Sequence, residues 1–72
     1  MAKGNKPAAK FKIGWVTATV WANDSGFFNT VLSRSYKDNG DYKETDQMSH
    51  GDLPAAIKVL ERAEAWIADQ QQ

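Results

Sequence analysis

Residues 11–36 read FKIGWVTATVWANDSGFFNTVLSRSY, and they form the β-rich part of this 72-residue chain. β-Branched and aromatic residues dominate residues 11–22 and 27–36, and the intervening NDSG (residues 23–26) consists of turn-forming residues. The two runs therefore predict two antiparallel strands joined by a tight turn. Residues 1–10 are expected to form a flexible basic arm, and residues 11–70 a single α+β domain.

Alternation along the first run separates two faces of the predicted sheet. One face carries small aliphatic side chains, which suit packing beneath a helix: Val16, Ala18 and Val20. The other carries Trp15, Thr17, Thr19 and Trp21. In the second run, Phe28 and Leu32 are the expected core residues, although a β-bulge would exchange the faces. Gly14 is typical of a bulge or of a close backbone approach.

The remainder of the chain predicts one more hairpin and a helix. Asn39-Gly40 favours a hairpin turn, and residues 42–48 then form a polar edge strand. Ser49 or Asp52 caps a helix that contains Pro54 in its first turn. The fold is thus an antiparallel three- to four-stranded meander followed by one C-terminal helix packed on one sheet face. The order is β-β-β-α, or β-β-β-β-α if the chain breaks at Gly14.

Apolar residues recur along the helix with the spacing of one buried face. They are Leu53, Ala56, Ile57, Leu60, Ala63 and Ile67. Glu64 interrupts this stripe. A charged residue is expected here if the last turns of the helix extend beyond the sheet and leave it in solvent. Val59 and Trp66 lie beside the stripe and widen it beyond what one sheet face requires. They indicate a second contact surface, and we expect them at the interface of a homodimer.

Composition narrows the class of protein. The chain has no cysteine, so no disulfide or thiolate metal site can add to the stability of its small core. Self-association is the expected way to bury more apolar surface. No apolar run approaches the ~18–20 residues of a membrane span, and the N-terminus lacks the apolar stretch of a signal peptide. A cytoplasmic protein without membrane contact is expected. Residues 1–37 carry a net charge of +5 and residues 38–72 a net charge of −5, which predicts a basic sheet backed by an acidic helix.

Catalysis is not expected. His50 is the single histidine and sits beside a helix start, where a capping or surface role is typical. Ser49 beside it has no third residue to orient a nucleophile–base pair, and Asp46 and Asp52 suit strand-end and cap positions. Residues 38–44 hold three carboxylates but lack the spacing of a calcium loop. No cofactor, metal or small-molecule substrate is therefore predicted.

One set of aromatic and basic residues suggests a surface that binds nucleic acid. Aromatic platforms within a basic surface bind single-stranded nucleic acid by stacking and phosphate contacts. The candidate contacts are Lys12, Trp15, Trp21, Arg34, Tyr36, Lys37 and Lys43. We therefore expect a module for single-stranded nucleic acid, DNA in the first place, with little sequence preference. The alternative is a protein-interaction or assembly module with an unknown partner, whose aromatic residues are buried in an oligomer.

Two resemblances accompany these motifs. VTATVW (residues 16–21), LSRSYKD (32–38), KET (43–45) and Asp52-Leu53 resemble a family of small bacterial proteins without known activity, over about residues 13–67. More loosely, the order of features resembles the single-stranded-DNA-binding coactivators of the positive-cofactor-four family, related to the Whirly proteins. This second resemblance implies nucleic-acid contacts for Arg34, Tyr36 and Lys43, and dimer contacts for Val59 and Trp66. The chain departs from that family at Lys43-Glu44 and His50-Gly51, where the family has Lys-Pro and Lys-Gly.

Overall fold

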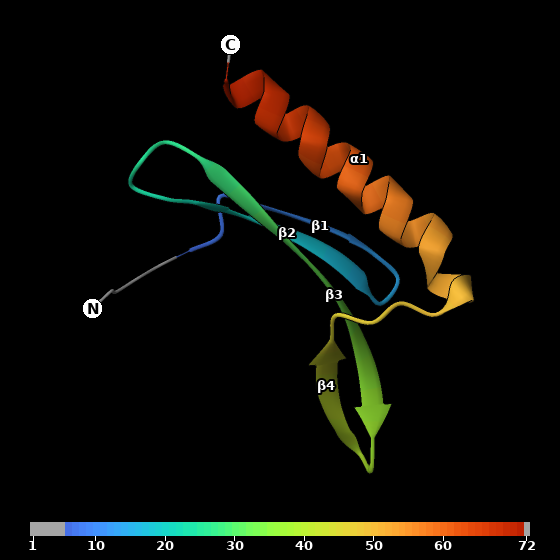
Figure 1. The fold of residues 1–72 in the computed structure, drawn as a ribbon. Helices are drawn as coiled ribbons and strands as arrows, with labels where there is room; N and C mark the ends of the chain where they lie inside the picture. Colours follow the sequence, from blue (N-terminus) through green and yellow to red (C-terminus); the bar gives the residue numbers. More distant parts are fainter. Residues whose placement is uncertain (1–5, 72) are drawn as a thin grey trace.

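Four antiparallel strands follow one another in a sheet, and one helix crosses one face of it (Figure 1). The computed structural model describes residues 6–71. The elements are β1 (Ala9–Ile13), β2 (Val16–Ala22), β3 (Phe28–Asp38), β4 (Asp41–Thr45), a 3-10 helix (His50–Asp52) and α1 (Leu53–Gln70). This arrangement confirms the predicted α+β meander with its C-terminal helix. It takes the four-stranded form, because the chain turns at Gly14.

Local backbone chemistry explains the three turns. Gly14 has φ +59°, and Asn39 and Gly40 have φ +52° and +84°, so both short hairpins use the left-handed region that glycine and asparagine tolerate. In the longer β2–β3 turn, the Asn23 side-chain oxygen accepts hydrogen bonds from the amides of Ser25 and Phe27, each at 3.0 Å. The turn thus satisfies its own backbone donors.

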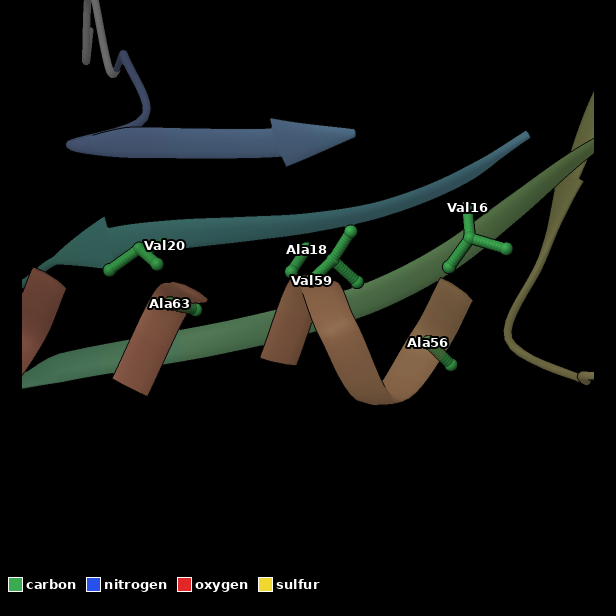
Figure 2. Close-up of a cluster of buried hydrophobic side chains, with 6 residues drawn as sticks. All are labelled: Val16, Ala18, Val20, Ala56, Val59 and Ala63. Carbon is green, nitrogen blue, oxygen red and sulfur yellow. The ribbon is translucent and has the colours of Figure 1, made fainter. Parts of the chain in front are cut away.

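The core lies between α1 and the first two strands. Val16, Ala18 and Val20 of β2 are at most 2% exposed, as the alternation predicts, and Phe28 and Leu32 pack against them from β3. In Figure 2, Val59 points from the helix toward β2, with Ala56 and Ala63 on either side of it in the helix. Small side chains on both surfaces allow the helix to approach the sheet closely.

The helix buries only part of the predicted face. Ala56 and Ala63 are buried as predicted, and Ile67 packs against the core. Val59 is 0% exposed and Trp66 packs edge-on against Phe28 with ring centroids 5.4 Å apart, so both belong to the chain's own core. Leu53, Ile57 and Leu60 are instead 42%, 63% and 40% exposed. The prediction of Val59 as a dimer contact is therefore wrong. The helix turns Ala56, Val59 and Ala63 toward β2 and leaves the larger Leu53, Ile57 and Leu60 outside.

The N-terminal boundary also differs from the prediction. Ala9 and Lys10 belong to β1, and the amide of Ala8 donates to the carbonyl of Val20 at 2.7 Å. The sheet therefore begins within residues 1–10, the segment predicted as a flexible basic arm, and residues 1–5 of that segment lie outside the described residues. At the other end, the predicted strand over residues 42–48 ends at Thr45.

Candidate functional site

The sheet face opposite α1, called the open face here, carries three of the seven predicted binding residues on its strands: Lys12, Trp21 and Lys37. Strand alternation and the pairing register place on it every side chain that points away from the buried Val16, Ala18 and Val20. These are Lys10, Lys12, Thr17, Thr19, Trp21, Asn29, Val31, Ser33, Ser35, Lys37, Tyr42 and Glu44. Its strand residues thus combine three lysines and two aromatic rings with a single carboxylate.

A cleft opens where β3 extends past the start of β2. The last contact between the two strands is the Ser35 amide donating to the Trp15 carbonyl at 2.8 Å, and beyond it β3 pairs only with β4. This end of the β3–β4 hairpin projects away from the helix (Figure 1). The cleft, called the β3 cleft below, has a volume of about 260 Å³. It is lined by Trp15, Arg34, Ser35, Tyr36, Lys37 and Tyr42.

Aromatic rings and cations alternate around the β3 cleft. Trp15 stacks on Tyr42 with ring centroids 5.9 Å apart and an interplanar angle of 26°. Lys37 Nζ lies 5.9 Å from the Tyr42 ring centroid, and Arg34 Cζ lies 5.9 Å from that of Tyr36. Trp15 and Tyr42 are 56% and 64% exposed. Such rings are available for stacking, and their positive neighbours suit an anionic aromatic ligand.

The position of Arg34 depends on a network at the start of the helix. Asp52 Oδ2 lies 3.0 Å from Arg34 Nε, and the same oxygen accepts from the Ser49 hydroxyl at 2.8 Å and the Ser49 amide at 3.0 Å. Arg34 Nε also lies 3.3 Å from the Gln47 carbonyl. Because guanidinium has five N–H donors, these contacts fix one end of Arg34 and leave other donors for a ligand.

The Asp52 network predicts a pH dependence of stability. The Ser49 hydroxyl, the Ser49 amide and, less strongly, the Arg34 guanidinium hold the pKa of Asp52 below its ordinary value. A carboxyl whose pKa is lowered by folding stabilises the fold above its unfolded pKa of about 3.9, and this contribution disappears as the pH falls through the folded pKa.

Asp52→Asn is therefore expected to reduce the free energy of unfolding at pH 6. Between pH 6 and pH 2.5, the free energy of unfolding should fall less in Asp52→Asn than in the wild type. Urea unfolding at both pH values measures the difference. Ser49→Ala, which removes the first of the donors, should reproduce part of this change. The same pH dependence in wild type and Asp52→Asn would contradict the assignment.

Four of the seven predicted contacts meet in the β3 cleft. They are Trp15, Arg34, Tyr36 and Lys37. Lys12 and Trp21 lie elsewhere on the open face. Lys43 pairs with Tyr36 on the opposite face of the sheet, where its Nζ lies 3.2 Å from Asp38 Oδ2. It therefore does not join the others.

Two residues of this surface were missed by the sequence prediction. Tyr42 follows the Asn39-Gly40 turn and pairs with Lys37, so the register of a two-residue hairpin was the signal that could have identified it. Lys10 was assigned to the arm, but it pairs with Thr19 in the sheet. Both residues add to the aromatic and basic character that the prediction anticipated.

Comparisons with protein-family models, with curated proteins and with solved structures found no significant match to this chain. In the part of the chain that the structure describes, α1 lacks the apolar character needed to cross a membrane. Within residues 6–71 there is also no cluster of three or more histidine, aspartate or glutamate side chains that could hold a metal ion. The geometry of the open face is therefore the basis for assigning a function.

Proposed function

We propose that this protein binds single-stranded nucleic acid through the open face, with the β3 cleft as the principal contact. The observation that carries the proposal is the stacked pair of Trp15 and Tyr42, exposed beside Lys37 and Arg34. Base stacking on such rings contributes about 1–3 kcal/mol per base, and cations beside them attract phosphates. The loose resemblance to single-stranded-DNA-binding coactivators points the same way.

The geometry favours single strands over duplexes. The Trp15 and Tyr42 rings already contact each other, so a base would stack on an outer surface of the pair. Bases inside a duplex are stacked on their neighbours and cannot make this contact, whereas unstacked bases of a single strand can. Because every base has an aromatic face, binding of this kind has little sequence preference.

Tryptophan fluorescence tests the proposal directly. A single strand of ~20 nucleotides should quench the emission at low salt, the same sequence as a duplex should not, and moderate salt should weaken the effect. Arg34→Ala combined with Lys37→Ala should lower the slope of log affinity against log salt by about 1.4, at about 0.7 per phosphate contact. The absence of any response at low salt would refute nucleic-acid binding and favour a protein-interaction module.

We further propose that the protein is a homodimer and that the helix provides the contact. Leu53, Ile57 and Leu60 form an exposed apolar flank of α1, and a groove of about 350 Å³ follows it between Leu60, Ile67 and Thr30 of β3. A domain of this size gains stability by burying such a surface. A second copy supplies the same apolar flank in a two-fold arrangement.

Ile57→Asp is expected to convert the dimer to a monomer, because it would bury an unpaired carboxylate in the contact. Sedimentation equilibrium measures the change as a dissociation constant raised by at least tenfold. Ala65→Asp introduces the same charge at an exposed position of the helix outside this apolar flank, where it should leave the dimer intact. A wild-type protein that is monomeric at all concentrations measured would refute the dimer.

A further inference from the structure

The open face has a second aromatic position, remote from the β3 cleft. Trp21 lies near the end of β2, beside a groove of about 250 Å³. The groove is lined by Pro7, Lys10, Thr17, Thr19, Trp21, Ser33 and Glu44. It provides one ring, one ammonium group, three hydroxyls and the carboxylate of Glu44. The ring can stack on a base, and the ammonium group and the hydroxyls can donate to phosphate or sugar oxygens.

The two aromatic positions are separated along one strand of the sheet. Trp15 and Trp21 are six residues apart, and β2 connects them in extended conformation, which corresponds to about 20 Å. Thr17 and Thr19 point to the open face between them, and Ser33 lies opposite Thr17 on β3. The path between the rings is therefore continuous, and it carries small hydroxyl side chains that do not obstruct a ligand.

From this arrangement we propose that one single strand crosses the open face and stacks bases at both Trp15 and Trp21. The inference rests on the proposed function and specifies its ligand. At about 3.4 Å per nucleotide of a stacked strand, a separation of ~20 Å corresponds to about six nucleotide steps, and a more extended strand needs fewer. The ligand is thus a strand of roughly six nucleotides or more, and a mononucleotide engages only one position.

The charges of the open face indicate where the backbone of that strand lies. Lys10 and Lys12 project from β1 at one edge of the sheet, and Lys37 marks the end of the path at the β3 cleft. Glu44 projects from β4 on the other side. Phosphates are attracted to the lysines and repelled by the carboxylate. The backbone therefore follows the β1 side, and the bases face β2 and β3.

Linking two stacking contacts through one strand should produce a characteristic dependence on length. Once the first base is bound, the second contact is intramolecular and benefits from a high effective concentration. Affinity is expected to rise at least tenfold between strands of three and eight nucleotides, and then to increase only slowly with the number of binding registers.

The test compares oligothymidylates of three, six, eight and twelve nucleotides, measured by competition against a labelled twelve-nucleotide strand. Trp21→Ala should lower the affinity for twelve nucleotides at least tenfold and leave that for three nucleotides nearly unchanged. Trp21→Phe, which keeps an aromatic ring, should restore most of the loss. The melting temperature of each variant verifies its fold.

The outcomes distinguish this inference from the function on which it rests. If long strands bind but Trp21→Ala does not change their affinity, the two-position path is refuted and binding at the β3 cleft remains. The same conclusion follows if Trp21→Ala lowers the affinities for strands of three and twelve nucleotides equally. If strands of no length bind, the proposed function itself is refuted. Oligouridylates of the same lengths, measured in parallel, show whether the path also accepts RNA.

Discussion

Replacing Val59 with alanine is expected to lower the free energy of unfolding by about 2 kcal/mol. Val59 is fully buried between α1 and β2, so the substitution removes apolar contacts and leaves a cavity in the core. A domain of this size obtains only about 3–5 kcal/mol from its core, so the loss is a large fraction of the total. In urea unfolding, the midpoint should fall while the slope stays constant.

Val31→Ala is the matched control for this measurement. Val31 lies on the open face and is 50% exposed, so the same chemical change should cost less than about 0.5 kcal/mol. The Val59→Ala result also distinguishes the core from a dimer contact. A core residue is needed at every protein concentration, whereas an effect that disappears in a dilute monomer would place Val59 between two copies.

The fold was predictable where local signals agree. Alternation identified Val16, Ala18 and Val20 as the buried face of β2. Asn39-Gly40 identified the β3–β4 turn, because both residues tolerate the positive φ values that the turn adopts. The beginning of the sheet was missed because Ala9 and Lys10 have little strand propensity of their own. They are held by pairing with β2, which is a tertiary effect that no local pattern reports.

The buried face of the helix was predicted only in part, for a physical reason. Two overlapping apolar stripes run along α1 and share Ala56 and Ala63, which the prediction places in the core correctly, but the prediction extends the buried stripe to Ile57 and Leu60. The structure buries the stripe with Ala56, Val59 and Ala63, since small residues allow closer contact with the similarly small side chains of β2. The sequence contains both stripes. The choice between them depends on the shape of the opposing surface.

The β3 cleft was predictable in composition but not in shape. Alternation places Arg34 and Tyr36 on the opposite side of β3 from Lys37, so a flat sheet would separate them. They line one cleft because β3 continues beyond β2, and Trp15 lies in the turn at this step. Relative strand lengths determine this geometry, and they follow from the turn at Gly14 and the sheet register together.

The second large effect is expected from the rings of the β3 cleft. Trp15→Ala and Tyr42→Ala should each weaken binding of a ~20-nucleotide single strand by about 5- to 150-fold, the equivalent of about 1–3 kcal/mol for one stacked base. The two effects should not add in the double variant, since the rings support each other as one stacked pair. Fluorescence anisotropy of a labelled strand measures all three affinities.

Conservative variants separate stacking from structural damage. Trp15→Phe and Tyr42→Phe keep an aromatic surface, so they should retain most of the affinity, whereas a loss of fold would lower it in these variants too. Because both rings are more than half exposed, the alanine variants should also unfold at nearly the wild-type urea concentration. Equal affinity of the alanine and phenylalanine variants would show that the cleft does not stack bases. Binding would then depend on the lysines of the open face alone, and it would extend to duplexes at low salt.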